Sequence, residues 1–243
     1  RRFRSNDIAM IFQDPMTSLN PFISIGEQLI EPLIYNEDKS RRQSRSDARL
    51  RAIELLDEVG ITDAEQRFDC FPHEFSGGMR QRIVIAIALR TSPSLIIADE
   101  PTSALDVTIQ RQLLDLLDRL RRYRGLSILF ITHDMGIVAS RADQVAVMYS
   151  GRIVEQGSTL EVFTHPRMPY TRALLASIPR IDHESHKKLA VIGGIPPIAI
   201  GPRVGCAFAP RCPDVIDACR TEIPQLVGDT HQAACIRNVV GVT

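Results

Sequence analysis

Continuous apolar runs along the chain predict several short buried strands. Residues 95–98 form an aliphatic run that ends at the acidic pair Asp99-Glu100. Such a run is typical of a central strand in a parallel sheet, because helices cover both faces of that sheet. Residues 8–12 predict a strand that ends at Gln13, and two further buried strands are predicted over residues 127–132 and 144–149.

The segments between these predicted strands have the apolar periodicity of helices. Within residues 46–59, apolar positions recur at the spacing of an amphipathic helix, which Gly60 ends. Residues 79–89 are apolar on nearly every side, which predicts a buried helix that begins after Ser76-Gly77-Gly78. Asp106 can cap a third helix, whose apolar stripe is Ile109, Leu113, Leu116, Leu117 and Leu120. Strands that alternate with helices predict an α/β layered core.

The pattern changes after Gly157, where we place a domain boundary between residues 1–157 and 158–243. Ser158 and Glu161 form a capping box for a short helix. Pro169 stands where a first-turn proline would begin another helix, which we expect to end near residue 179. The remainder is rich in Pro and Gly and holds four of the five cysteines.

The composition narrows the class of protein. Hydrophobic residues make up 44% of the 243 residues, which is enough for a real core. Twenty-nine basic and 29 acidic residues give a net charge of zero, which argues against a protein held on nucleic acid. Two arginine-rich stretches are interpreted as solvated helix faces: Arg41, Arg42, Arg45, Arg49 and Arg51, and Arg119, Arg121, Arg122 and Arg124.

No apolar run reaches the roughly 18 residues that a membrane-spanning helix needs. The basic N-terminus has no apolar stretch after it, so it is not typical of a secretory signal. We therefore expect a cytoplasmic protein without paired disulfides.

Three groups of residues have the chemistry of a phosphate site. Asp99 and Glu100 follow a buried strand, at the sheet edge where open α/β folds bind ligands, and His133 ends the next strand. Ser76-Gly77-Gly78 opens a helix, whose N-terminal N–H groups attract anions. Taken singly, each is more often an ordinary surface acid, a structural histidine or a loop. We expect Glu100 and His133 to converge on a common hollow.

Together with their neighbours, these residues resemble the motifs of ATP-binding-cassette (ABC) ATPases. The stretch 75–82 resembles the signature sequence, and residues 95–100 resemble the Walker B strand. The D-loop, the switch-histidine loop and the Q-loop are matched by residues 103–106, 131–134 and 12–15. This resemblance implies a partial RecA-like ABC nucleotide-binding domain, with a helical signature subdomain over about residues 22–90 and a small Cys-rich C-terminal extension.

The resemblance also implies a role for each site residue. Glu100 would polarise the attacking water, His133 would contact the γ-phosphate, and Asp99 would hold Mg²⁺. Gln13 would reach both Mg²⁺ and that water. ATP bound to an opposite subunit would be clamped through Ser76, Gly77 and Gly78, with Gln81 and Asp106 from the signature and the D-loop beside them.

One family motif is missing. No G-x-x-x-x-G-K-[ST] phosphate loop (Walker A) occurs in the 243 residues. We expect that the N-terminal part of the nucleotide core is lacking, and that this polypeptide alone neither binds ATP tightly nor hydrolyses it.

Two segments indicate the cargo. Residues 14–21 and 164–175, the latter with His165-Pro166 and Pro169-Tyr170, resemble the dipeptide/oligopeptide importer ATPases of the peptide/nickel branch. The resemblance implies a subunit that energises uptake of dipeptides or oligopeptides, peripheral on the cytoplasmic face of the inner membrane. It would pair with a second ABC ATPase subunit or domain, two transmembrane permease subunits and an extracytoplasmic peptide-binding protein, with no nucleic acid.

Several alternatives stay open. The cargo could be nickel or glutathione, since importers of both belong to the same branch. An ABC protein that acts on ribosomes or DNA is disfavoured by the zero net charge and by the peptide-importer tail. A truncated, non-hydrolysing binding module is the third alternative.

The tail holds a candidate metal site. Four thiols lie on one loop-rich segment: Cys206, Cys212, Cys219 and Cys235. Such a set is typical of a small segment that a bound metal stabilises. The segment resembles that of peptide-importer ATPases, some of which carry a [4Fe–4S] cluster. Zn²⁺ and unligated thiols are the alternatives, although zinc sites usually have more closely spaced cysteines.

Overall fold

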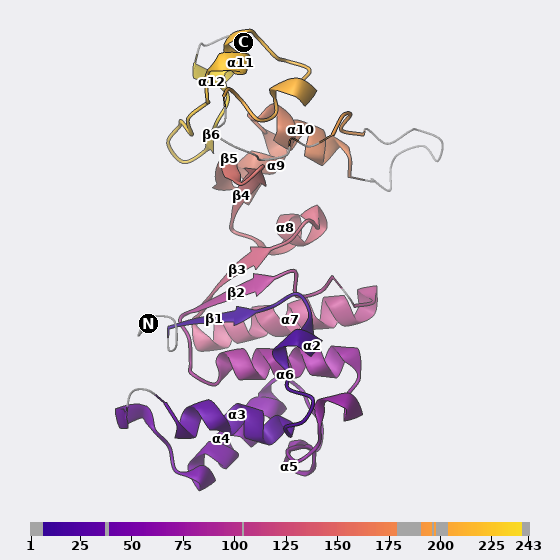
Figure 1. The fold of residues 1–243 in the computed structure, drawn as a ribbon, viewed down its shortest axis with the longest axis vertical. Helices are drawn as coiled ribbons and strands as arrows, with labels where there is room; N and C mark the ends of the chain where they lie inside the picture. The colour runs from indigo at the N-terminus through magenta and orange to yellow at the C-terminus, as the bar shows by residue number, and fades with distance from the viewer. Residues whose placement is uncertain are drawn as a thin grey trace. The chain divides into compact units, whose positions relative to one another are not determined.

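We describe a computed structural model of the chain, which places residues 7–36, 39–103, 105–178, 191–195, 197 and 204–239. These residues form two compact units, which we treat separately: unit 1, Arg1–His133, and unit 2, Asp134–Thr243 (Figure 1). None of the helices in the described part has both the length and the apolar character to cross a membrane.

A three-stranded parallel sheet is the centre of unit 1. Its strands are β1 (Ile8–Ile11), β2 (Leu95–Asp99) and β3 (Ser127–Ile131), in the order β1-β2-β3. The prediction that residues 95–98 form a central parallel strand is therefore confirmed. Because all three strands run in the same direction, their carboxyl ends meet at one edge of the sheet.

Helices cover one face of this sheet. Side chains of β1 and β2, Ile11 and Ile96, share a buried core with α6 (Gly77–Leu89) and α7 (Val107–Arg124). The same core continues into α3 (Ile25–Ile34) and α4 (Arg45–Glu58), which pack against α6 (Figure 1). Shorter elements complete the unit: α2 (Pro15–Ser18), η1 (Lys39–Arg41), α5 (Ala64–Arg67) and η2 (Pro72–Glu74).

The helix boundaries follow the predicted signals. The backbone N–H of Ile109 donates to Oδ1 of Asp106 at 3.0 Å, which confirms that Asp106 caps α7. Gly60 has a φ of +80° directly after the C-cap of α4, a conformation that glycine adopts without strain. The α6 helix is buried over most of its surface, as its uniformly apolar sequence predicts.

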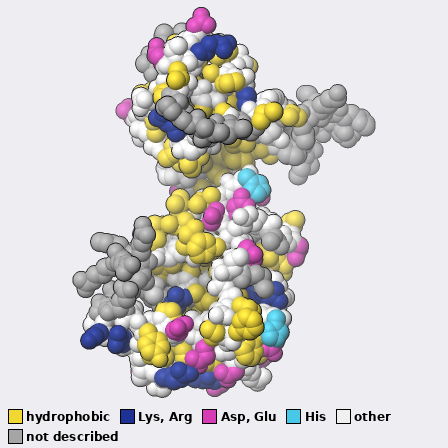
Figure 2. Space-filling view, viewed as in Figure 1, with side chains coloured by type: hydrophobic (Ala, Val, Ile, Leu, Met, Phe, Trp, Pro, Cys, Tyr) yellow, Lys and Arg dark blue, Asp and Glu magenta, His cyan; other side chains and the backbone are white. Residues whose placement is uncertain are grey.

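The other face of the sheet is apolar and exposed, which corrects the prediction that residues 127–132 form a buried strand. Leu129 and Ile131 of β3 are 51% and 46% exposed, and Met10 of β1 is 40% exposed. Met10, Ile97 and Leu129 form one row across the three strands, so they lie on the same face. Figure 2 shows hydrophobic side chains gathered over these strands. Among the residues that the structure describes, helices cover only one of the two faces of this sheet.

Unit 2 contains an antiparallel sheet of β4 (Gln144–Tyr149), β5 (Arg152–Ser158) and β6 (Gln232–Ala233). The predicted strand over residues 144–149 is therefore present, but its expected place in the parallel α/β core is wrong. The β4 strand instead turns directly into β5 at Ser150 and Gly151, which both have a positive φ. Two such residues make the type of turn that joins antiparallel neighbours.

Helices of unit 2 pack around this hairpin. The predicted capping box is present, since Ser158 accepts from the N–H of Glu161 at the start of α9 (Thr159–Thr164). Pro169 is the first residue of α10 (Pro169–Ala176), as predicted, whereas residue 179 lies outside the described residues. The remaining helices are α8 (Met135–Arg141), η3 (Ala209–Arg211), α11 (Ala218–Thr221) and α12 (Ile236–Val239).

The domain boundary stays a prediction. Gly157 lies inside β5, whereas the two compact units divide between His133 and Asp134.

Candidate functional site at the sheet edge of unit 1

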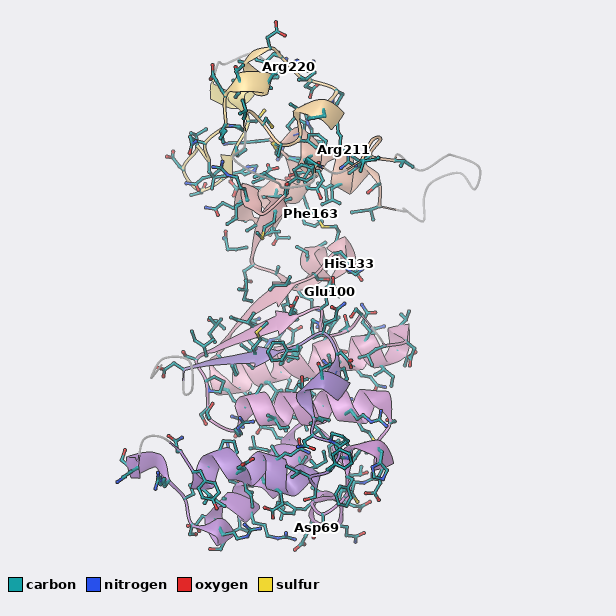
Figure 3. The ribbon with its side chains drawn as sticks, in the orientation of Figure 1. Asp69, Glu100, His133, Phe163, Arg211 and Arg220 are labelled. Carbon is teal, nitrogen blue, oxygen red and sulfur yellow. The ribbon has the colours of Figure 1, made fainter. Side chains whose placement is uncertain are left out.

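Three polar side chains meet at the carboxyl edge of the parallel sheet. Nε2 of Gln13, just after β1, donates to Oε2 of Glu100 at 2.8 Å. Nδ1 of His133, just after β3, lies 2.9 Å from Oε1 of Glu100. Figure 3 shows the side chains of Glu100 and His133 next to each other beyond the strand ends. The expected convergence of Glu100 and His133 is thus present, with Gln13 as a third member.

The backbone at Glu100 directs its side chain into this cluster. Glu100 has a φ of +44°, in the left-handed region that costs a non-glycine residue on the order of 1 kcal/mol. Its N–H donates to the carbonyl of Ile131 at 2.9 Å, and its carbonyl accepts from the hydroxyl of Ser103 at 3.1 Å. These bonds hold the strained turn. Sequence reasoning gave Ser103 no such role, although a hydroxyl three residues after a strand end is a turn signal.

The cluster has the chemistry of a general base that can reach solvent. The side chain of Glu100 is 25% exposed and that of His133 is 78% exposed. Each oxygen of an ionised carboxylate can accept about two hydrogen bonds, so the bonds to Gln13 and His133 leave acceptor capacity for a water molecule. Asp99 ends β2 beside Ile131 and is partly buried, which puts a second carboxylate at the same edge.

The N-termini of α6 and α7 lie side by side. A Cβ atom built on Gly78 would stand only 2.8 Å from Cγ2 of Ile109, so the two first turns are in contact there. Ser76 accepts from the N–H of Met79 at 3.4 Å as the N-cap of α6, and both Ser76 and Gly77 are exposed. The exposed N–H groups of this turn could meet an anion.

The predicted roles of two further site residues, Gln81 and Asp106, are not tested by the structure. Gln81 is only 1% exposed, and its Nε2 has no hydrogen-bond partner among the described residues. Ala104, in the middle of the predicted D-loop, lies outside the described residues, while Asp106 caps α7. The cofactor-binding roles given to Gln81 and Asp106 stay predictions.

The four cysteines of the tail lie close to one another in unit 2. Cys206, Cys212 and Cys235 belong to one hydrophobic cluster, and the N–H of Cys206 donates to the carbonyl of Cys219 at 2.8 Å. All are free thiols, and burial raises the pKa of Cys206 and Cys212. Within the described residues, no group of three or more His, Cys, Asp or Glu side chains is arranged to hold a metal ion. This arrangement gives no support to the expected iron–sulfur cluster or to Zn²⁺.

Two family models match the chain. One, described as ABC transporter, matches residues 1–103. The other, described as Oligopeptide/dipeptide transporter, C-terminal region, matches residues 154–219. The first covers the Q-loop, the signature and the Walker B strand, and the second covers β5 and the segment with Pro169-Tyr170.

Known proteins resemble the chain over nearly its whole length. A putative peptide import ATP-binding protein of Brucella melitensis is 51% identical over 244 residues, covering 98% of this chain and 71% of the relative. The oligopeptide transport ATP-binding protein AppD of Bacillus subtilis is 51% identical over 233 residues, covering 96% and 69%.

A solved structure shares the fold. It is the dimeric, post-hydrolysis state of the ATP-binding cassette MJ0796 bound to ADP and Pi, with a TM-score of 0.55 and 27% identity, over 65% of this chain and 65% of that one. The ABC nucleotide-binding fold expected from the motifs is therefore confirmed. Sequence, fold and motif order agree: the chain belongs to the family of ATP-binding subunits of oligopeptide/dipeptide ABC transporters.

Proposed function

We propose that the chain is part of the ATP-hydrolysing subunit of an importer of dipeptides or oligopeptides. The observation that carries the proposal is the cluster of Gln13, Glu100 and His133 at the sheet edge, with the hydrogen bonds of 2.8 and 2.9 Å that join it. Relatives named as peptide import and oligopeptide transport proteins support the cargo class.

The proposed reaction is transfer of the γ-phosphoryl group to water, in which positioning and charge stabilisation supply most of the rate. Glu100 accepts the proton of the attacking water, while Gln13 and His133 hold the carboxylate of Glu100 in place. His133 is exposed enough to contact the phosphate as well. Asp99 and Gln13 would hold Mg²⁺, which neutralises charge on the phosphates.

The second half of the ATP site comes from the N-terminus of α6. Ser76, Gly77 and Gly78 would contact the γ-phosphate of ATP bound to an opposite subunit, with Gln81 and Asp106 supporting this turn from α6 and α7. The exposure of Ser76 and Gly77 supports a role in trans, because a helix N-terminus at the surface is accessible to an anion held by another subunit.

We further propose the assembly in which this chemistry does work. A second ABC ATPase subunit or domain completes the ATP sites, and two transmembrane permease subunits and an extracytoplasmic peptide-binding protein carry the cargo. The subunit is peripheral, on the cytoplasmic face of the inner membrane. This part rests on the family alone.

The 243-residue chain by itself should neither bind ATP tightly nor hydrolyse it. It has no phosphate loop, and the exposed apolar sheet face of unit 1, around Leu129, is what an incomplete core would present. Mg²⁺-dependent ATP hydrolysis by the pure chain should not exceed background. Hydrolysis that Glu100→Gln abolishes would contradict this proposal.

Cargo is tested by uptake in cells whose importer carries the complete ATP-binding subunit. We expect Glu100→Gln to abolish uptake of a labelled dipeptide or oligopeptide, whereas Glu54→Gln, on an exposed face of α4, leaves uptake intact. Loss of nickel or glutathione uptake, with peptide uptake unchanged, would support the alternative cargo within the same branch and overturn the peptide assignment.

A [4Fe–4S] cluster on Cys206, Cys212, Cys219 and Cys235 remains a separate proposal. The proximity of the four thiols in one unit supports it, although their sulfur atoms would have to rearrange before they could ligate iron. Protein purified without oxygen should be brown and lose its visible absorbance on Cys212→Ser. Colourless protein, with zinc or with free thiols, would overturn the cluster.

A further inference from the structure

Three helices of unit 1 are joined at one point by arginine side chains. Arg124, the last residue of α7, donates from Nε to Oε1 of Glu58 at 2.7 Å and from Nη2 to Oε2 of the same carboxylate. Its Nη1 also donates to the carbonyl of Leu89, the last residue of α6, at 3.3 Å. We call this the Glu58–Arg124 node. For Arg124, the node corrects the interpretation of the α7 arginines as a solvated face, whereas Arg119 and Arg122 are exposed.

Further arginines bind the same end of α4. Nη2 of Arg119 donates to the carbonyl of Glu58 at 3.1 Å, and Nη1 of Arg82, from α6, donates to the carbonyl of Val59 at 2.7 Å. The C-terminus of a helix carries partial negative charge and unpaired carbonyls, so guanidinium groups stabilise it.

The node is shielded from solvent, which sets it apart from ordinary surface pairs. The side chains of Arg124 and Glu58 are 13% and 21% exposed, and the hydrogen bond from Arg124 lowers the pKa of Glu58. A two-pronged arginine–carboxylate bond fixes geometry as well as charge. By comparison, Arg45 and Glu27 form a pair between α4 and α3 with 68% and 40% exposure, which we expect to contribute little.

The node stands at the opposite end of α6 from the exposed Ser76-Gly77 turn. The α6 helix contacts α7 at both ends, through Gly78 and Ile109 at the start and through Leu89 and Arg124 at the finish. Thirteen residues make a helix about 20 Å long, so a tilt of about 3° at the node moves the far end by about 1 Å. A shift of that size matters for catalysis.

We infer that Glu58 and Arg124 are positioning residues for ATP hydrolysis, because they fix the direction in which α6 presents the Ser76–Gly78 turn to its ligand. This inference rests on the proposed function. Neither residue touches ATP, so the loss should appear in turnover and not in ATP affinity.

The test compares Arg124→Gln, Glu58→Gln and the matched control Arg45→Gln in the importer with its complete ATP-binding subunit. We expect each node variant to lower kcat about tenfold while the KM for ATP changes less than about twofold, and Arg45→Gln to change neither. Arg124→Lys should have a kcat between those of Arg124→Gln and the unsubstituted importer. An ammonium group keeps the charge of Arg124 but cannot make its two-pronged hydrogen bond to the carboxylate of Glu58. Unchanged kcat in a folded node variant would overturn the inference.

A second measurement uses the 243-residue chain and requires no activity. Hydrogen exchange of the amides in residues 77–89 should be faster in Arg124→Gln than in the unsubstituted chain, and unchanged in Arg45→Gln. Equal exchange in Arg124→Gln would contradict the inference even if the importer were active. An unsubstituted importer without ATP turnover would instead overturn the proposed function.

Discussion

Two backbone positions of unit 1, Glu100 and Gly78, would not tolerate most residue types. Glu100 stands at a φ of +44°, held by the carbonyl of Ile131 and the hydroxyl of Ser103. Gly78 allows α6 to approach α7 at Ile109, where any side chain would collide. Conformational strain at Glu100 places the carboxylate of the Gln13–Glu100–His133 cluster, and close approach at Gly78 places the two helix N-termini.

Gly77 and Gly78 give a matched pair of substitutions at this turn. The β-branched side chain of Ile109 cannot easily move away from the new methyl group of Gly78→Ala, so we expect a loss of about 1–3 kcal/mol in the free energy of unfolding. No other described atom lies within 4 Å of a Cβ at Gly77, so Gly77→Ala should be neutral or slightly stabilising. Urea unfolding of the 243-residue chain measures both; equal effects would show that the contact with Ile109 is unimportant.

The sequence was sufficient to predict that Glu100 and His133 converge. Both follow parallel strands, and the carboxyl ends of neighbouring parallel strands lie at one edge. It could not predict that the amide of Gln13 would bond Glu100, because that depends on side-chain rotamers. Nor could it predict the burial of Gln81, because a helix that is apolar on every side does not show which face a single polar residue occupies.

At the scale of whole elements, strand positions were predictable but strand partners were not. The β3 and β4 strands begin and end close to the predicted residues, yet β3 leaves one face exposed and β4 pairs with β5 in a separate sheet. A hydrophobic run predicts a strand that can be buried. It does not predict which other elements cover that strand. Arg124 was misjudged for the same reason, because its partner Glu58 is 66 residues away in the sequence.

Buried Glu155 holds together the elements of unit 2. Its carboxylate is 0% exposed and accepts from the backbone N–H groups of Arg167 and Met168 at 2.6 and 3.1 Å, directly before α10. Nε2 of His231 lies 2.7 Å from its Oε1. A single side chain of β5 thus binds two segments that are distant in sequence.

Glu155→Ala leaves these donors buried without an acceptor, so we expect it to lower the free energy of unfolding of unit 2 by about 3 kcal/mol. Chemical denaturation of the 243-residue chain measures this loss. Glu222→Gln, which changes an exposed glutamate of the same unit directly after α11, is the control and should have little effect. A similar loss of unfolding free energy in both variants would show that the hydrogen bonds of Glu155 do not specifically stabilise unit 2.

On the scale of the whole molecule, the described residues form two separate hydrophobic cores. One runs from Ile11 to Leu126 and lies entirely in unit 1, while the other runs from Val147 to Cys235 in unit 2. Each unit also has its own shielded pair of polar side chains: Glu58 with Arg124 in unit 1, and Glu155 with His231 in unit 2. A unit with its own core is able to unfold on its own.

We therefore expect two unfolding transitions. Arg124→Gln should shift only the transition of unit 1, and Glu155→Ala only that of unit 2. Hydrogen exchange followed by mass spectrometry during urea titration assigns each transition to its peptides. A single transition that both substitutions shift equally would show that the two units unfold as one.

We propose that Glu100, held by Gln13 and His133, activates the water that cleaves ATP. The most direct test is peptide-stimulated ATP hydrolysis by the importer with its complete ATP-binding subunit. Glu100→Gln should lower kcat by about 100-fold or more while ATP still binds, because the amide cannot accept the proton of the attacking water. Turnover by Glu100→Gln close to that of the unsubstituted importer would contradict the role of Glu100 as the base that activates water.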